Sequence, residues 1–247
     1  MDGSRNTQRI GRVVGLWRYP VKSMAAEPLT EVDVSWHGLA GDRRWAFVRR
    51  GVPQSGFPWL TIRDRADMSH YRAVFTDPAR PDSSPTVVCT PRGARFEVTD
   101  PALAEELSPG GAAVIRQDRG IFDTFPLSLV TTQTLDRIGR SIRELGGSPL
   151  DVQRFRPNFL VESSVDAPFL EDGWVGAVLR IGGLRFRIDK RDGRCVIITI
   201  DPVTMERNPA ILRHVAQERQ GCVGVYGSTV EPGRVALDDE VLLESPA

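Results

Sequence analysis

The sequence predicts a mainly β protein with a few helices, and three features of the chain lead to this prediction. The 247 residues include 23 glycines and 18 prolines, which interrupt the chain so often that most apolar runs are short. The hydrophobic fraction of 40% and the charged fraction of 26% are typical of a soluble globular protein. The length suffices for one large β-rich domain or two modest ones, with a sizeable core.

Thirteen short apolar segments are predicted as strands because turn residues bound each of them. They span residues 10–16, 29–34, 45–48, 86–89, 95–98, 113–116, 127–130, 152–162, 177–181, 184–189, 195–200, 222–230 and 240–243. A break at residues 99–111 contains a short helical patch followed by Ser-Pro-Gly-Gly. This break indicates a boundary between two domains, residues 9–108 and residues 109–245.

Two longer helices are predicted in the second half of the chain. The first, at residues 132–145, has apolar side chains at spacings of three and four and stops at two glycines. The second has Asn208 as its N-cap and Pro209 at the first helical position, and Gly221 ends it.

Bulk charge and motif content argue against several classes of function. The chain has 32 basic and 32 acidic side chains, and a net charge of zero gives no support to nonspecific binding of nucleic acid or anionic membranes. It contains no Walker-type phosphate loop, no GxSxG nucleophile elbow and no HExxH zinc motif. We therefore expect neither nucleic acid nor a membrane as a partner.

The cysteine pattern and the N-terminal residues predict a cytoplasmic protein. Residues 1–9 are polar and lack the apolar stretch of a secretory signal, and no segment approaches the roughly 20 apolar residues that span a bilayer. Cys89, Cys195 and Cys222 are far apart and form no CxxC pair. They predict neither a disulfide framework nor a structural zinc site or iron–sulfur cluster.

Two basic loops in the first half of the chain are candidates for an anion site. In WRYPVKS, a strand runs into a loop stiffened by proline, which presents Lys22 and Ser23 as a cation and a hydroxyl donor. The alternative for this segment is a solvated loop. In GLAGDRRW, two glycines three apart permit a tight turn that projects Asp42 and Arg43. Arg43 is then expected either to bind a phosphate or to pair with Asp42 and fix the turn.

The segment DVQRFRPN, residues 151–158, is predicted to be an extended strand. Strand alternation would place Arg154, Arg156 and Asn158 on one face. The following proline would keep Arg156 extended. Two arginines and an amide on one face suit a multiply anionic ligand, and a solvent-facing strand is the alternative.

Cys195 lies where the basic turn KRDGRC enters an apolar run. Neighbouring cations favour the thiolate form of cysteine, which attacks electrophiles and binds soft metals. A buried, inert cysteine is the alternative, and it is the expected state of Cys89 and Cys222. No histidine or second cysteine pairs with Cys195 in the sequence, so hydrolase-type nucleophilic catalysis is poorly supported.

Taken in this order, the segments YPVKS, GLAGDRRW, RFRPN and RC-VIITIDP resemble the MOSC superfamily, in the branch with a preceding MOSC N-terminal β-barrel domain. The resemblance covers about residues 9–245. Relatives in this branch include the mitochondrial amidoxime-reducing component and its bacterial counterparts, which bind a molybdopterin-type cofactor and reduce N-hydroxylated compounds. The resemblance implies a MOSC β-barrel domain packed against a smaller N-terminal β-barrel-like domain.

The resemblance also implies roles for individual residues. Cys195 is implied as the catalytic residue and as the thiolate ligand of molybdenum. Cofactor-binding roles are implied for Lys22, Ser23, Arg43, Arg154, Arg156, Asn158 and Arg194. Thr131 and Thr132 precede the first helix, whose N–H groups favour an anion, and they are predicted phosphate contacts. For Asp201, an active-site role and a turn cap both stay open.

The activity implied by the resemblance is two-electron reduction of a small N-hydroxylated substrate by a molybdenum-dependent oxidoreductase. The electrons are expected from a separate partner protein that carries flavin, haem or an iron–sulfur cluster. Pyridoxal phosphate is not expected to be required. The alternative is a sulfur carrier in which Cys195 holds a persulfide for assembly of a metal–sulfur cofactor, a role associated with the superfamily.

Overall fold

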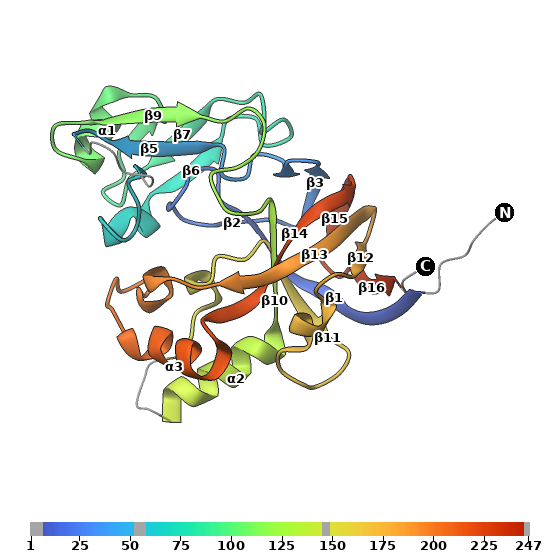
Figure 1. Cartoon of the computed structure of the whole chain (residues 1–247). Coiled ribbons are helices and arrows are strands. Elements are labelled where there is room, and N and C mark those ends of the chain that lie inside the picture. The colour runs from blue at the N-terminus through green and yellow to red at the C-terminus, as the bar shows by residue number, and fades with distance from the viewer. Residues whose placement is uncertain (1–6, 52–57, 145–148, 245–247) are drawn as a thin grey trace.

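The computed structural model describes residues 7–51, 58–144 and 149–244, and this part of the chain is mainly β with three α-helices. Seven strands form a closed barrel in the order β11-β10-β14-β13-β12-β16-β1, because β1 pairs back onto β11. The barrel occupies the lower half of Figure 1, and a smaller β-rich lobe lies above it. The predicted fold class is confirmed.

The barrel strands are β1 (Thr7–Arg18), β10 (Leu127–Thr131), β11 (Phe159–Ser163), β12 (Val178–Ile181), β13 (Leu184–Gly193), β14 (Cys222–Glu231) and β16 (Glu240–Glu244). The other strands are β2 (Glu27–Pro28), β3 (Glu31–Ser35), β4 (Gly38–Leu39), β5 (Trp45–Arg49), β6 (Arg72–Phe75), β7 (Thr86–Cys89), β8 (Arg95–Glu97), β9 (Ala112–Arg116) and β15 (Gly233–Ala236). The helices are α1 (Pro101–Leu107), α2 (Thr132–Glu144) and α3 (Pro209–Arg219), with short 3-10 helices η1 (Ala66–His70), η2 (Val152–Arg154), η3 (Leu170–Trp174) and η4 (Val196–Thr199).

Alternating apolar residues fill the interior of the barrel. Val13 and Leu16 of β1 pack with Leu129, Phe159 and Phe186 from three other strands, and all five are almost fully buried. Most neighbouring strands are antiparallel, whereas β10 and β11 run parallel. In such a closed sheet none of the seven strands is an edge strand, so each of them is hydrogen-bonded to a neighbouring strand on both sides.

The upper lobe has its own apolar core, which is separate from that of the barrel. Strands β5 and β9 form one sheet, and β6, β7 and β8 form another. Helix α1 covers them, and Phe47, Tyr71 and Leu103 are buried between these elements. The two cores make the molecule bilobal, which leaves room for a site between the lobes.

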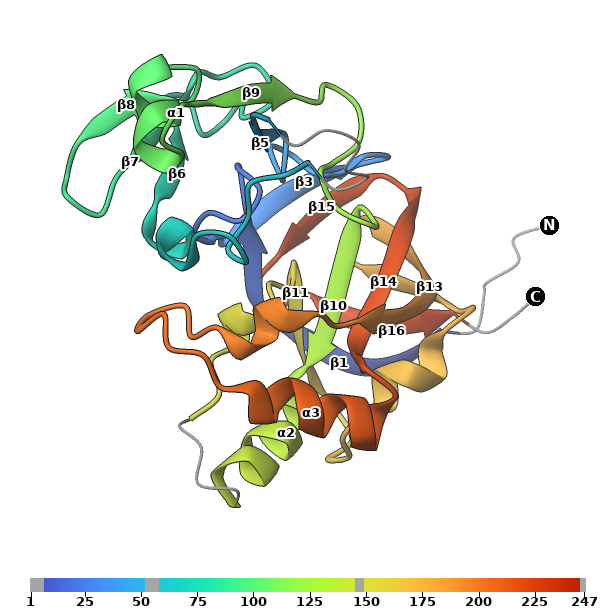
Figure 2. The ribbon, with the colours of Figure 1, turned by 60° about the vertical axis from the view of Figure 1, so that its left-hand side comes forward.

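Helices α2 and α3 lie side by side beneath the barrel in Figure 2. Ile138 and Ile142 of α2 pack with Ile211 and Val215 of α3 in a third buried cluster. The Asn208 side chain caps α3 by accepting a hydrogen bond from a backbone N–H, as predicted. The predicted end of the first helix, at residues 145–147, lies outside the described residues.

Strand pairing links segments from both sides of the predicted domain boundary. Strand β1 belongs to the barrel through β11 and β16, and β3 pairs with β15. In the opposite direction, β9 follows residue 108 but pairs with β5 of the upper lobe. The division into residues 9–108 and 109–245 stays a prediction.

Two predicted strands are wrong in part or completely. Residues 152–162 contain the 3-10 helix η2 and an irregular turn, and only β11 at the end of this segment is a strand. Arg156 has φ of +51°, so the proline after it does not keep it extended. Residues 195–200 form η4 instead of a strand, because a short buried apolar run has no period that separates strand from helix. The predicted strands do not include β2, β4, β6 or β15.

The N-terminus of α2 binds an anion, but that anion is a side chain of the protein. The Glu171 carboxylate accepts hydrogen bonds from the hydroxyls of Thr131 and Thr134, each at 2.9 Å, and from the Thr131 N–H at 3.3 Å. Thr132 bonds instead to the neighbouring Gln133 side chain. Glu171 thus occupies the helix end where the sequence predicted phosphate contacts.

Glu171 gives a stability prediction because burial raises its pKa above the ordinary value of 4.5. A carboxyl with a raised folded-state pKa stabilises the fold fully below pH 4.5 and loses this contribution as the pH rises through its folded pKa. Glu171→Gln stays neutral, so its free energy of unfolding should improve relative to wild type as the pH rises from 4.5 through the raised folded-state pKa of Glu171. Urea unfolding across this pH range measures the difference. Glu218→Gln on the exposed face of α3 should show no such trend, and parallel curves for Glu171→Gln would contradict the prediction.

Candidate functional site

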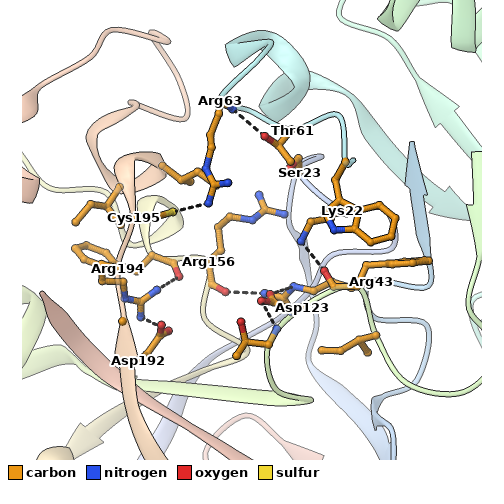
Figure 3. A pocket seen from close by; sticks show the side chains of 18 of the residues that line it. Lys22, Ser23, Arg43, Thr61, Arg63, Asp123, Arg156, Asp192, Arg194 and Cys195 are labelled. Carbon is orange, nitrogen blue, oxygen red and sulfur yellow. Dashed lines mark hydrogen bonds and ion pairs between the residues drawn. The ribbon is translucent and has the colours of Figure 1, made fainter. Parts of the chain in front are cut away.

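A cavity of about 620 Å³ lies between the barrel and the upper lobe, and Figure 3 shows most of its lining. Seven of the residues singled out in the sequence line it: Lys22, Ser23, Arg43, Arg154, Arg156, Arg194 and Cys195. The fold thus brings together segments that are far apart in the chain. Three other predicted residues, Asn158, Thr131 and Thr132, are not part of the lining.

Three of these residues share an unusual backbone conformation. Ser23 has φ of +69°, Arg43 of +45° and Arg156 of +51°, all in the left-handed region that side chains other than glycine rarely adopt. Such conformations persist only where surrounding contacts enforce them, and they gather at functional sites. Their concentration around one cavity marks it as the candidate functional site.

Arg43 is held almost entirely by the protein itself. Its guanidinium donates to Asp42 at 2.5 Å, pairs with Asp123 at 2.9 Å and donates to the Arg156 carbonyl at 2.9 Å. The two carboxylates raise the pKa of Arg43 despite its burial. The expected pairing of Arg43 with Asp42 is therefore confirmed, and Arg43 also faces the cavity.

Asn158 acts through this same network. Its side-chain nitrogen donates to Asp42 and to the Trp17 carbonyl, both at 3.2 Å, and its oxygen accepts from the Ser128 backbone and hydroxyl. All of its hydrogen bonds are internal, and it is 1% exposed. The structure places Asn158 as a support for Asp42, behind the cavity wall.

Arg154 and Arg194 are also committed to the protein. Arg154 donates to the Thr199 carbonyl at 3.1 Å and pairs with Asp201 at 2.5 Å. Arg194 donates to the carbonyls of Val223 and Phe155 and pairs with Asp192 at 2.6 Å. These bonds fix the loops that carry both residues, η2 and the turn before Cys195.

Asp201 caps the turn after η4. One of its carboxylate oxygens accepts from the N–H groups of Val203 and Thr204, each at 2.9 Å, while the other pairs with Arg154. These bonds lower the pKa of Asp201 against the effect of burial. Asp201 is not part of the cavity lining, so the turn-cap reading is the one that the structure supports.

Arg156, unlike Arg43, Arg154 and Arg194, has no carboxylate partner among the described residues. Its guanidinium stacks over the Tyr19 ring, 4.1 Å from the centroid, and its buried Nη2 has no hydrogen-bond partner in the described part of the chain. Burial, together with the nearby charge of Arg43, lowers the pKa of Arg156 to about 10. A buried guanidinium nitrogen without an acceptor indicates a place for an anionic ligand.

Lys22 and Ser23 lie beside Arg156 on the upper side of the cavity. The Lys22 ammonium donates to the Phe122 carbonyl at 2.6 Å, and burial lowers its pKa to about 8. The Ser23 hydroxyl makes no hydrogen bond with any described residue, although Ser23 is 5% exposed. Both side chains line the cavity, as the anion-site reading of this loop requires.

The two carboxylates of the cavity have different environments. Asp123 faces Arg43 and Lys22, which lower its pKa against the effect of burial. Asp192 is 1% exposed, and burial raises its pKa to about 7 although Arg194 pairs with it. Near neutral pH, Asp123 is therefore ionised and Asp192 changes its protonation state.

Cys195 lies on the cavity wall at the start of η4, and an arginine that the sequence reasoning missed bonds to it. Arg63 Nη2 donates to the Cys195 Sγ at 3.2 Å. Figure 3 shows the Arg63 side chain reaching down from the upper part of the view toward Cys195, with the hydrogen bond between them as a dashed line. Arg63 lies in the segment after Trp59, which also lines the cavity and packs against Phe122 with ring centroids 5.1 Å apart.

The missed residues carry little signal in the sequence. Arg63 lies in a charged stretch, TIRDRAD, that looks like many solvated loops, and Tyr226 lies in the middle of an apolar strand. Both residues line the cavity, and only the closure of the barrel and the packing of the upper lobe bring them there. Residues 52–57, which precede Trp59 in the chain, lie outside the described residues.

Two further observations concern what the described chain contains. No helix within residues 7–51, 58–144 and 149–244 is long and apolar enough to cross a membrane. Within these same ranges, no three or more side chains of His, Cys, Asp or Glu gather in a group that could hold a metal ion.

The chain is similar in sequence, over most of its own length, to proteins that share one name. The chain is 29% identical to the molybdenum cofactor sulfurase of Drosophila grimshawi over an alignment of 244 residues. This alignment covers 84% of this chain and 31% of that protein. It is 28% identical over 278 residues to the molybdenum cofactor sulfurase of Danio rerio, with 91% and 32% covered. The chain thus spans about a third of the length of these relatives.

One solved structure is similar in fold, and two family models match the sequence. The crystal structure of the YuaD protein from Bacillus subtilis is similar with a TM-score of 0.54 at 14% identity, covering 98% of this chain and 100% of that one, which shows the fold alone. The MOSC N-terminal beta barrel domain matches residues 10–82, and the MOSC domain matches residues 116–242, just over half of the chain. The chain therefore belongs to the MOSC domain family, with the MOSC N-terminal beta barrel domain preceding the MOSC domain.

Proposed function

We propose that the cavity between the lobes binds a molybdenum cofactor, with the Cys195 thiolate as a ligand of the metal. The observation that carries the proposal is that Cys195 lies on the wall of a cavity lined by six cationic side chains and two carboxylates. A phosphate-bearing pterin is an anion of suitable class for such a lining. Thiolate is a soft ligand of the kind that binds transition metals.

The residues of the site fit this cofactor. The Arg156 Nη2, which has no hydrogen-bond partner among the described residues, is a donor that an anionic group would satisfy, and the Ser23 hydroxyl is a second donor in the cavity lining. Lys22 would add a positive charge beside them. Arg43, Arg154 and Arg194 hold the surrounding loops through their internal bonds, so they act mainly by positioning.

We further propose that the loaded protein reduces small N-hydroxylated compounds. The balanced reaction takes an N–OH group, two electrons and two protons to an N–H group and water. The cofactor supplies the two-electron oxygen-atom transfer when it is bound, and the protein supplies binding, orientation and charge. The electrons would come from a separate protein. Asp192, whose pKa is about 7, is a cavity carboxyl able to hold a proton at neutral pH.

Replacing Cys195 tests the metal site. Cys195→Ser should lower the molybdenum content of protein purified from a molybdate-fed host by roughly tenfold or more, because the thiolate ligand is lost. It should also abolish reduction of an amidoxime with a supplied chemical reductant. Cys222→Ser removes a thiol outside the cavity and should leave both values unchanged. A wild-type protein that contains neither molybdenum nor pterin would contradict the proposal.

A second candidate function is sulfur transfer through a Cys195 persulfide. The similar proteins from Drosophila grimshawi and Danio rerio are named molybdenum cofactor sulfurases, and this observation favours the candidate. Loss of activity in Cys195→Ser would not separate the two functions, since both need the thiol. Intact-protein mass spectrometry separates them: a carrier should show a reducible sulfur adduct on Cys195 without molybdenum. Metal-loaded protein free of such an adduct would contradict the carrier function.

The depressed pKa of Lys22 predicts how anion binding depends on pH. Lys22 is cationic below its pKa of about 8 and neutral above it, so the affinity for an anion should fall as the pH rises through this value. Sulfate is a suitable probe because it does not titrate in this range. Its Kd should rise roughly fivefold between pH 7 and 9.5 in wild type and clearly less in Lys22→Met.

Ionisation of Asp192 near pH 7 is common to both proteins, so the difference between the two curves isolates Lys22. Isothermal titration calorimetry at constant ionic strength gives both curves. Equal pH dependence in the two proteins would show that Lys22 does not face the bound anion.

A further inference from the structure

Arg63 brings a positive charge from the upper lobe to the reactive sulfur of the barrel. Its Nη2 lies 3.2 Å from the Cys195 Sγ, and both residues line the cavity. Neither the family motifs nor the sequence pattern assigns this residue a role. Any small molecule that reaches Cys195 from the cavity comes close to the Arg63 guanidinium (Figure 3).

The backbone that carries Arg63 is held from two sides. The Arg63 N–H donates to the Thr61 hydroxyl at 3.3 Å, and Asp64 accepts from the Thr61 N–H and hydroxyl at 3.0 Å each. From the barrel lobe, Arg207 donates to the Arg63 carbonyl at 3.2 Å. These bonds fix the base of the side chain, so less conformational entropy is lost when the guanidinium binds a ligand.

The chemistry of the surrounding wall favours a particular ligand class. A guanidinium has five N–H donors in a planar fork, which allows one side chain to bond a sulfur and a carboxylate together. The nearby Trp59 and Phe122 rings give an apolar surface beside this fork. The cationic excess of the lining further favours an anionic substituent on the ligand.

We propose that Arg63 is a specificity-determining residue: the small molecule that enters the cavity beside Cys195 carries a carboxylate, and the Arg63 guanidinium binds it. This inference rests on the proposed function in so far as it names the substrate class, a carboxylate-bearing N-hydroxylated compound. Its physical core, selection by charge at Cys195, is testable on protein that contains no cofactor.

The test compares two alkylating reagents of similar size on the full-length chain from a host without pterin-cofactor synthesis. Iodoacetate carries a carboxylate, and iodoacetamide is neutral. The ratio of their rate constants at one pH cancels the ionised fraction of the thiol, so it reports only the selection by charge. Peptide mapping by mass spectrometry reads Cys195 and Cys222 separately, and Cys222, outside the cavity, serves as the internal reference.

The iodoacetate-to-iodoacetamide ratio at Cys195 should exceed that at Cys222, and Arg63→Gln should lower it roughly fivefold or more. Arg63→Lys keeps the charge without the fork and should retain most of the ratio. Arg92→Gln removes an exposed arginine of the β7–β8 turn and should leave the ratio unchanged. An unchanged ratio in Arg63→Gln, or an equal fall in Arg92→Gln, would overturn the proposal. An unaltered Cys222 rate shows that each variant is folded.

With cofactor-loaded protein, benzamidoxime and its 4-carboxy derivative extend the test to the substrate. Arg63→Gln should raise KM for the carboxylated compound at least fivefold more than for the neutral one, so the ratio of the two KM values reports the selection by carboxylate. A wild-type protein that reduces neither compound would remove the proposed function, while the alkylation ratio would still decide the role of Arg63. Reduction of both compounds with equal KM changes in Arg63→Gln would overturn the selection by carboxylate.

Discussion

The buried carboxylate of Asp42 is the interaction on which the rest of the site depends. Asp42 is 0% exposed, and it accepts hydrogen bonds from the Tyr19 N–H at 2.6 Å, from Arg43 at 2.5 Å and from Asn158 at 3.2 Å. A buried carboxylate without such donors costs several kcal/mol. The three donors come from the end of β1, the turn after β4 and the segment before β11. The Asp42 carboxylate therefore joins the turn after β4 to the barrel through hydrogen bonds.

Arg43 extends this constraint to the cavity. Its guanidinium bonds Asp42 and the Arg156 carbonyl at once, which ties the left-handed turn at Arg156 to the one at Arg43. Both guanidinium groups stack on the same Tyr19 ring, at 4.5 Å and 4.1 Å. Asp42 and Asp123 neutralise the charge of Arg43, so the charge that an anionic ligand would neutralise at this ring is that of Arg156.

The sequence predicts the strands well and the connections poorly, for a physical reason. Alternating apolar residues specify β1 or β14 locally, whereas η4 is an apolar run whose helical turn is decided by packing. The motifs located Lys22, Arg43 and Cys195 at the cavity, because turn residues and proline shape those loops. They did not reveal Arg63, which reaches Cys195 through a contact 132 residues apart in the chain.

A sequence motif also does not show which of its arginines is available to bind a ligand. Arg154 and Arg194 belong to the motif segments as clearly as Arg156, yet each pairs with a carboxylate. Thr131 and Thr132 lie at a helix N-terminus as expected, but Glu171 already supplies the anion there. Availability depends on partners supplied by distant segments, and pairing follows from the closed barrel. What distinguishes Arg156 is therefore the fold around it, which buries one of its guanidinium nitrogens and places no carboxylate partner beside it among the described residues.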